Sequence, residues 1–169
     1  MPSTRPVRSC RPLWFAVAGA VMLLDQWSKA WILELLATGE NRVLTPFFNL
    51  VLVHNQGAAF SMLSDAAGWQ RGLFSIIALG ISAWIAVTLW RHPARSLLNG
   101  ALSLILGGAV GNLTDRLMRG AVVDFLDFHW LGHHWPAFNV ADSAITVGAV
   151  LLVLDAFISG RRPQGGTHH

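Results

Sequence analysis

Two aspartates in apolar surroundings are the residues of this chain best placed for acid–base chemistry. Asp142 stands near the start of the apolar stretch 139–158, and Asp124 lies between a pair of valines and Phe125. Carboxylates in such a setting are rare unless they face a partner or water, so each is a candidate functional group. If the chain brings the two together, they cannot both ionise comfortably and should share one proton. One carboxylate then serves as a base towards water and the other as an acid.

Both aspartates also have a structural interpretation. Asn139 is typical of a residue that caps a helix N-terminus, which would make Asp142 the third helical residue and a capping-box acid. On position alone, that role explains Asp142 as well as catalysis does, and a structural hydrogen bond explains Asp124 alone equally well. If the two do form a pair, the helix N-terminus favours the ionised form of Asp142. Asp124, in apolar company, would then more often hold the proton.

Further ionisable residues lie within the apolar segments. Asp25 and Lys29 are four residues apart on one helical face, and a structural ion pair explains them better than direct chemistry does. Asn112 and Arg116 also share a helical face, with Asp115 beside them. Arg116 fits either an interfacial anchor or a residue that holds a loop or the substrate backbone.

A Ser/Lys protease is a weaker interpretation. Lys29 is the only lysine of the chain, so that mechanism would have to use it. Nothing in the sequence around Ser28, Ser61 or Ser103 favours a nucleophilic serine.

A metal site is also a weak interpretation. His129 and His133 are four residues apart and His134 follows them, and histidines at that spacing on a helix can share an ion. Gly132 and Pro136 disfavour a continuous helix there, and no His-Glu-x-x-His motif occurs. We therefore expect neither a bound metal nor another cofactor.

Composition predicts that these residues belong to a membrane protein. Of the 169 residues, 53% are hydrophobic and only 12% are charged, which is outside the usual range of soluble domains. Four apolar segments approach the ~20 residues that a helix needs to cross a bilayer. We predict membrane helices at residues 13–36, 72–90, 97–117 and 139–158, joined by outer loops at 37–71 and 118–138, in a single integral membrane domain spanning 1–169.

Basic residues predict the orientation of the helices, because short cytoplasmic segments collect Lys and Arg. Arginines precede the first segment, fill the turn between the second and third, and follow the fourth: Arg5, Arg8, Arg11, Arg91, Arg95, Arg161 and Arg162. Both termini are therefore expected to be cytoplasmic, with Asp124 and Asp142 facing outward. Because no basic run is interleaved with aromatic residues, nucleic acid is not an expected partner, whereas membrane lipid is.

The first outer loop contains a predicted strand. Phe47–Val53 is a run of β-branched and aromatic residues that follows Pro46 and precedes the turn sequence Asn55-Gln56-Gly57. The second outer loop, broken by Gly120, Gly132 and Pro136, returns the chain to the fourth helix.

Five blocks of sequence, in this order, resemble the lipoprotein signal peptidases, also called signal peptidase II. They are Leu24-Asp25-Gln26 with Lys29, Asn55 to Phe60, Gly107 to Asn112 with Asp115-Arg116, Val122 to Phe125, and Pro136 to Ser143. The blocks run from the first predicted helix into the fourth, and no motif position departs from the pattern.

The resemblance implies an all-α membrane protein with four transmembrane helices, and a small extracytoplasmic β-sheet cradle in the first outer loop with an adjoining interfacial helix. It implies an aspartic endopeptidase of the bacterial cytoplasmic (inner) membrane. Such an enzyme cleaves diacylglyceryl-modified prolipoproteins before the lipidated cysteine and is blocked by globomycin. The expected partners are prolipoprotein signal peptides that carry diacylglyceryl-cysteine, and the chain is expected to act as a monomer.

The resemblance also implies roles for particular residues. Asp124 and Asp142 match the catalytic pair. The positions that line or shape the active site are matched by Asn55, Gly57, Asn112, Arg116, Asn139 and Ala141. The surrounding polar support is matched by Asp25, Lys29 and Asp115. Two alternatives stay open from the residues themselves: a small proton-coupled membrane transporter, although repeated halves are not evident, and a histidine-based membrane metalloprotease.

Overall fold

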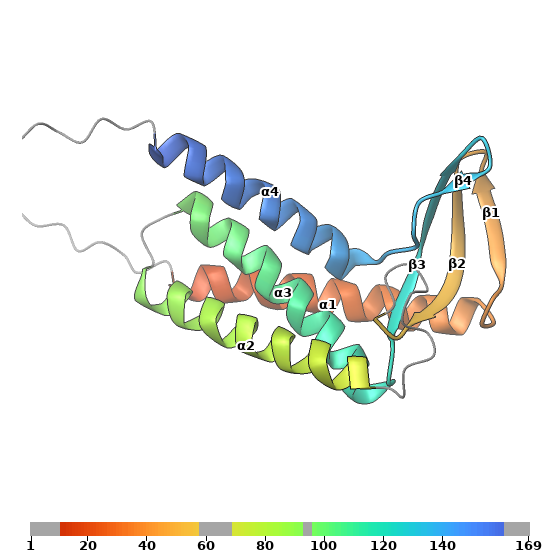
Figure 1. The fold of residues 1–169 in the computed structure, drawn as a ribbon, viewed down its shortest axis with the longest axis horizontal. Helices are drawn as coiled ribbons and strands as arrows, with labels where there is room; N and C mark the ends of the chain where they lie inside the picture. Colours follow the sequence, from red (N-terminus) through yellow and green to blue (C-terminus); the bar gives the residue numbers. More distant parts are fainter. Residues whose placement is uncertain (1–10, 58–68, 93–95, 161–169) are drawn as a thin grey trace, which may run out of the picture.

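Four long helices and a small sheet form the structure. The computed structural model describes residues 11–57, 69–92 and 96–160. The helices are α1 (Arg11–Leu35), α2 (Trp69–Arg91), α3 (Ser96–Met118) and α4 (Val140–Gly160). They lie side by side, and the sheet covers one end of the bundle (Figure 1). The start of α1 and the end of α4 both lie at the opposite end of the bundle (Figure 1). All four predicted helices are therefore present, with boundaries within three residues of those expected.

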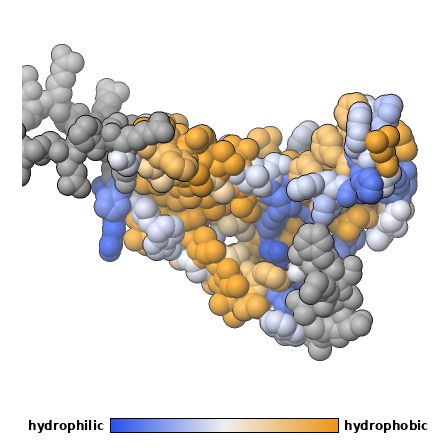
Figure 2. All heavy atoms as spheres, turned by 45° about the horizontal axis from the view of Figure 1, so that its top comes forward, coloured by the Kyte–Doolittle hydropathy of each residue, from blue (hydrophilic) through white to orange (hydrophobic). Residues whose placement is uncertain are grey.

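Three of the described helices, α2, α3 and α4, are long and apolar enough to cross a membrane. α1 is not among them, although it has 25 residues, because Asp25, Gln26 and Lys29 interrupt its apolar sequence. Figure 2 shows hydrophobic residues over the surface of the helices and hydrophilic residues gathered towards the sheet. By length and composition, these three helices are candidate membrane spans, as expected of an integral membrane protein.

α3 is the central helix of the bundle and packs against α1, α2 and α4. Its small residues permit close approach to the neighbouring helices. A Cβ added to Gly107 would lie 2.5 Å from the carbonyl oxygen of Ala18 on α1, and one added to Gly108 would collide with Ala141 on α4. α3 therefore brings polar groups of α1 and α4 within hydrogen-bonding distance of its own.

The sheet has the strand order β1-β2-β3-β4, with antiparallel neighbours. Its strands are β1 (Asn41–Thr45), β2 (Phe48–Asn55), β3 (Val122–Trp130) and β4 (His133–His134). The strand predicted at Phe47–Val53 is confirmed as β2. The expectation that the sheet belongs to the first outer loop is incomplete, because β3 and β4 come from the second. β3 completes the sheet by pairing with β2, with Leu50 opposite Leu126 and Val53 opposite Asp124.

The sheet is attached to the end of α1 by an apolar core. Ile32 and Leu36 pack against Leu50 and Leu52 of β2 and against Val123 and Phe125 of β3. These β3 residues flank Asp124, so their burial fixes the position of that aspartate. The expected interfacial helix beside the sheet is absent from residues 36–57, the described part of the first outer loop. Residues 58–68 lie outside the described residues.

Candidate active site

Asp142 lies in the first turn of α4, where the sequence predicted it. The backbone N–H of Asp142 donates to Oδ1 of Asn139 at 2.9 Å, so Asn139 caps the helix as expected. The carboxylate of Asp142 accepts a hydrogen bond from Nδ2 of Asn112 on α3, at 2.8 Å. The cap therefore fixes the backbone, while the side chain is held by the neighbouring helix.

Asp124 is held by amides from two different elements. It lies on β3 and is only 2% exposed. Asn55, at the end of β2, donates from Nδ2 to Oδ2 of Asp124 at 2.9 Å, and Nδ2 of Asn139 donates to Oδ1 at 2.6 Å. Asn55 is itself positioned by a turn, because its Oδ1 accepts the backbone N–H of Gly57 at 2.8 Å. The predicted turn after β2 therefore places the Asn55 side-chain amide where it can donate to Asp124.

The structure brings the two aspartates to one site at the start of α4. Asn139 contacts Asp124 and Asn112 contacts Asp142, and Nδ2 of Asn139 lies 3.3 Å from Oδ1 of Asn112. A continuous chain of four side chains therefore joins the carboxylates. The two carboxylates also interact electrostatically, because the negative charge of Asp142 acts on Asp124.

The pKa of Asp124 is raised to about 6. Burial is the largest cause, because desolvation disfavours the charged form, and the negative charge of Asp142 adds to it. The hydrogen bonds from Asn55 and Asn139 and the charge of Lys29 act in the opposite direction. Asp124 is thus an acid that can hold its proton at a pH where an ordinary aspartate cannot.

Lys29 is the centre of a buried polar network between α1 and α3, next to the site of the two aspartates. Its Nζ lies 2.8 Å from Oδ2 of Asp25, 2.7 Å from Oδ2 of Asp115 and 2.9 Å from Oδ1 of Asn112. All three charged side chains are fully buried. The ion pair expected between Asp25 and Lys29 is confirmed, and the structure adds Asp115 to it.

This network fixes the elements that carry the aspartates. Oδ1 of Asp25 accepts the backbone N–H of Ala141 in α4 at 2.9 Å. Oδ2 of Asp115 accepts the backbone N–H of Val123 in β3 at 3.2 Å. Each of these backbone groups lies next to one of the two candidate catalytic aspartates. The network therefore sets the distance between β3 and the start of α4.

Two members of the network received no role from the sequence. Nε2 of Gln26 lies 3.1 Å from each of three acceptors, namely Oδ2 of Asp25, Oδ1 of Asp115 and the carbonyl oxygen of Gly111, which share its two hydrogens. Arg119 pairs with Asp115 and donates to Oε1 of Gln26 at 3.0 Å. The spacing of Asp115 and Arg119, four residues apart, could have identified the second pair.

Arg116 and Gly57 lie near Phe74 of α2. Nη1 of Arg116 donates to the carbonyl oxygen of Asn112 at 3.4 Å, and its guanidinium lies 5.6 Å from the ring of Phe74. The Arg116 guanidinium lies close enough to Asp142, Asp115 and Asp124 for their negative charges to favour its charged form. Gly57 has φ +104°, and an added Cβ would lie 2.6 Å from the Phe74 ring. Only glycine fits this position without displacing Phe74.

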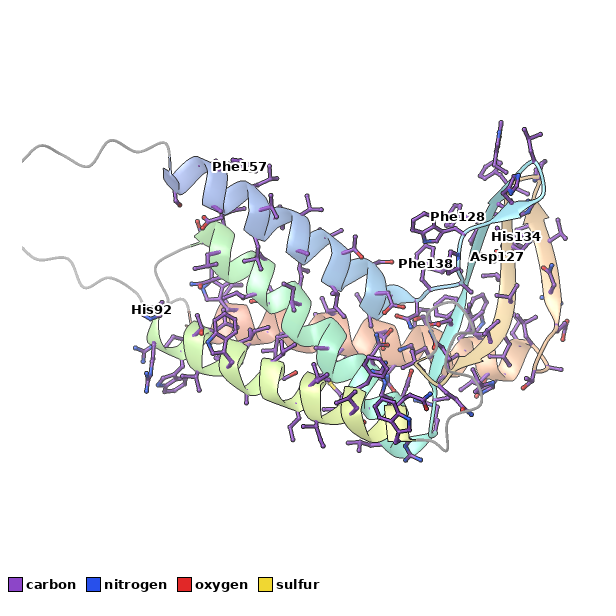
Figure 3. The ribbon with its side chains drawn as sticks, viewed as in Figure 1. His92, Asp127, Phe128, His134, Phe138 and Phe157 are labelled. Carbon is purple, nitrogen blue, oxygen red and sulfur yellow. The ribbon has the colours of Figure 1, made fainter. Side chains whose placement is uncertain are left out.

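The three histidines lie at the other end of β3, beside the hairpin to β4. His129 is paired with His134, and Nδ1 of His134 lies 2.9 Å from Asp127. Figure 3 shows Asp127 and His134 side by side on the sheet. Burial alone would raise the pKa of Asp127, but hydrogen bonds from His134 and Asn49 outweigh it and hold the pKa below the usual value. Within the described ranges, no three His, Cys, Asp or Glu side chains are grouped to hold a metal ion.

The serines considered for a Ser/Lys mechanism contact backbone groups. Ser28 donates to the carbonyl oxygen of Asp25 at 2.8 Å, and Ser103 donates to that of Asn99 at 2.7 Å. Lys29 bonds instead to carboxylates and an amide, as described above. Ser61 lies outside the described residues.

Replacement of Gly111 by alanine should destabilise the protein. The added Cβ would lie 2.6 Å from Oδ2 of Asp25, so the buried network would have to shift. We expect the free energy of unfolding to fall by roughly 1–3 kcal/mol, the usual cost of overpacking. Gly100→Ala, on the same helix, is the matched control because its Cβ would meet Trp14 only at 3.8 Å. Equal unfolding midpoints for the two variants would contradict a close contact at Gly111.

Comparison with known proteins identifies the family. The profile of the family described as signal peptidase (SPase) II matches residues 17–158. A lipoprotein signal peptidase from Shewanella baltica is 56% identical over 149 residues, covering 88% of this chain and 87% of the relative. One from Cupriavidus necator is 53% identical over 167 residues and covers 95% of each chain. This chain belongs to the signal peptidase II family, which is a family of peptidases.

Solved structures agree with this assignment. A bacterial membrane enzyme determined in meso at 2.3 Å matches with a TM-score of 0.78 and 29% identity, covering 94% of this chain and 95% of that one. A second bacterial membrane enzyme, determined in meso at 1.9 Å, matches with a TM-score of 0.74 and 32% identity. It covers 86% of this chain and 92% of that one.

Proposed function

We propose that this chain removes signal peptides from diacylglyceryl-modified prolipoproteins by cleaving before the lipidated cysteine. Asp124 and Asp142 are the catalytic pair, water is the nucleophile, and neither a metal nor another cofactor takes part. Membership of the signal peptidase II family supports the reaction. The observation that supports the mechanism best is the chain of side chains from Asp124 through Asn139 and Asn112 to Asp142.

The surroundings of the two aspartates support different roles for them. Asp142 lies at a helix N-terminus, whose partial positive charge favours an ionised carboxylate, so it takes the proton from water. Asp124 is buried with a pKa of about 6, so it supplies the proton that polarises the scissile carbonyl. When the tetrahedral intermediate collapses, a proton passes to the leaving amine. This assignment leaves the pair with one shared proton at the start of each cycle.

The remaining site residues position the pair and the substrate. Asn55, Asn112 and Asn139 hold the two carboxylates, as described above. Gly57, Arg116 and Ala141 complete the group proposed to shape the substrate site. The buried network of Asp25, Lys29 and Asp115 fixes β3 and the start of α4 relative to each other. Gly57 lets the backbone pack directly against the Phe74 ring, which fixes the turn that carries Asn55.

The proposed membrane placement follows from the distribution of charge. All of residues 1–169 form one integral membrane domain, with α1 as a fourth crossing and both termini in the cytoplasm. Arg11 at the start of α1 and Arg91 at the end of α2 lie at the end of the bundle opposite the sheet (Figure 1). The sheet and the two aspartates then face outward from the bacterial inner membrane. At that surface water can reach the site while the acyl chains of the substrate stay in hydrocarbon. The chain acts as a monomer.

The pH dependence of cleavage tests this mechanism. Because Asp124 must be protonated to act as the acid, kcat/KM should fall as the pH rises through about 6. The hydrogen bond from Asn55 favours the ionised form of Asp124. Asn55→Ala should therefore raise the pKa of Asp124 and move the fall in kcat/KM, the basic limb of the pH profile, to higher pH. The measurement is the rate of cleavage of a lipidated precursor across the pH range in neutral micelles.

A neighbouring amide provides the control for that measurement. Asn49 is on the same strand as Asn55, but its Nδ2 donates to Asp127 at 2.8 Å instead of to Asp124. Asn49→Ala should leave the basic limb in place. If Asn55→Ala leaves the apparent pKa of the basic limb unchanged, or if both variants shift it equally, the titrating group is not Asp124.

A further inference from the structure

A second polar site lies outside the candidate active site. It is a cavity of about 460 Å³ between the start of α2, the end of α3 and the end of β2. Arg71 and Arg119 line it together with His54, Gln56 and the backbone at Gly120. No carboxylate is among its described lining residues. Two guanidinium groups in one cavity make it suited to an anion.

Both arginines are positioned by contacts with the protein. Nη1 of Arg119 is engaged by Asp115 and Gln26, which leaves the N–H groups on Nε and Nη2 without a recorded partner among the described residues. Nη2 of Arg71 donates to the carbonyl of Leu117 at 3.4 Å, a long hydrogen bond at the end of α3. Gly120 has φ +84°, and an added Cβ there would lie 3.4 Å from Nη1 of Arg71. The Arg71 guanidinium therefore lies over the backbone turn that follows α3.

In the membrane placement proposed above, the cavity lies at the outer ends of α2 and α3, where a bilayer presents its phosphate groups. Arg71 is in the first turn of α2 and Arg119 directly follows α3, at the end of these helices that carries the sheet (Figure 1). Trp69 begins α2 at this level and is 55% exposed, as is typical of tryptophan at a membrane interface. At the end of membrane helices, the most abundant anions are the phosphodiesters of lipid headgroups.

We propose that the cavity between Arg71 and Arg119 binds the phosphate of a phospholipid headgroup. Arginine can meet phosphate oxygens with two parallel N–H groups, and two arginines can hold one phosphate from two sides. Arg119 also contacts Asp115, so a bound headgroup contacts the same arginine that supports the buried network. The inference is independent of the catalytic roles proposed for Asp124 and Asp142, because binding is measured without substrate.

A short-chain lipid tests the proposal on the full-length protein in neutral detergent. Dihexanoylphosphatidylglycerol should bind saturably to the wild type in isothermal titration calorimetry. Arg71→Gln should weaken binding about tenfold, the usual scale for losing a charge-assisted hydrogen bond. Arg71→Lys, which keeps the charge but loses the planar fork, should give an intermediate Kd. Arg42→Gln is the matched control, because Arg42 is an exposed arginine on β1 outside the cavity lining.

Two further probes separate phosphate recognition from other binding. Dihexanoylglycerol has the same acyl chains without the phosphate, and it should show no binding that Arg71→Gln weakens. Inorganic phosphate should displace the lipid only at a Kd at least about a hundredfold higher, because it lacks the glycerol and acyl contacts. Equal lipid Kd values for Arg71→Gln and Arg42→Gln would overturn the proposal. Inorganic phosphate that binds as tightly as the lipid would overturn the lipid assignment.

Discussion

Replacing either Asp124 or Asp142 with asparagine should reduce cleavage of a lipidated precursor by about 10²–10⁴-fold, the usual contribution of a positioned acid or base. Asparagine keeps the shape of the side chain but can neither take a proton from water nor return one. Because the two carboxylates act on one proton, the double variant should be little slower than either single variant. The measurement is the rate of signal-peptide release by purified protein, with thermal unfolding as the check on folding.

Asp127 supplies the matched control for these variants. It lies on the same strand as Asp124, three residues further on, and it is also buried. Its partners are Asn49 and His134, at the sheet and away from the start of α4. Asp127→Asn should therefore keep a cleavage rate within a few-fold of wild type. A loss of activity as large as that of Asp124→Asn would mean that the assay reports damage to the sheet.

Replacing Lys29 with methionine should lower the free energy of unfolding by about 3–5 kcal/mol. The methionine keeps the volume of the side chain but removes the charge that compensates Asp25 and Asp115, both fully buried. An uncompensated buried carboxylate is costly, and Asp115 retains Arg119 whereas Asp25 does not. Unfolding of the detergent-solubilised protein by SDS titration measures the effect.

A second substitution separates the loss of charge from the loss of packing. If the cost comes from the uncompensated Asp25, Lys29→Met with Asp25→Asn should recover part of the lost stability. Glu34→Gln, at an exposed position of the same helix, should leave stability within about 0.5 kcal/mol of wild type. A Lys29→Met protein as stable as the Glu34→Gln protein would show that the network contributes little to folding.

Local sequence signals predicted the helices and the cap well. Apolar length alone indicated all four helices, since hydrocarbon thickness sets a minimum for such segments. Asn139 was identified as the cap of α4, and the short side chain that makes it a good cap also brings its amide to Asp124. The strand signal at Phe47–Val53 gave β2, although the strand continues to Asn55.

Contacts distant in sequence were harder to predict. β3 has a β-branched and aromatic composition similar to that of β2, but glycines and a proline around it favoured a loop, and only pairing with β2 makes it a strand. The bond from Arg119 to Gln26 joins residues 93 positions apart, so no local pattern predicts it. Asp115 was placed among the supporting residues by resemblance, but its contact with Lys29 depends on how α1 and α3 pack.

The most direct test of the central claim compares one precursor with and without its diacylglyceryl group, incubated with wild type, Asp124→Asn, Asp142→Asn and Asp127→Asn in the same bilayer. The measured quantity is the initial rate of signal-peptide release. We expect wild type and Asp127→Asn to cleave the lipidated precursor at similar rates, and the unlipidated precursor to remain intact. Asp124→Asn and Asp142→Asn should each cleave the lipidated precursor at least about a hundredfold more slowly than wild type. Cleavage at the wild-type rate by a folded Asp124→Asn or Asp142→Asn protein would contradict the claim that these two acids carry the reaction.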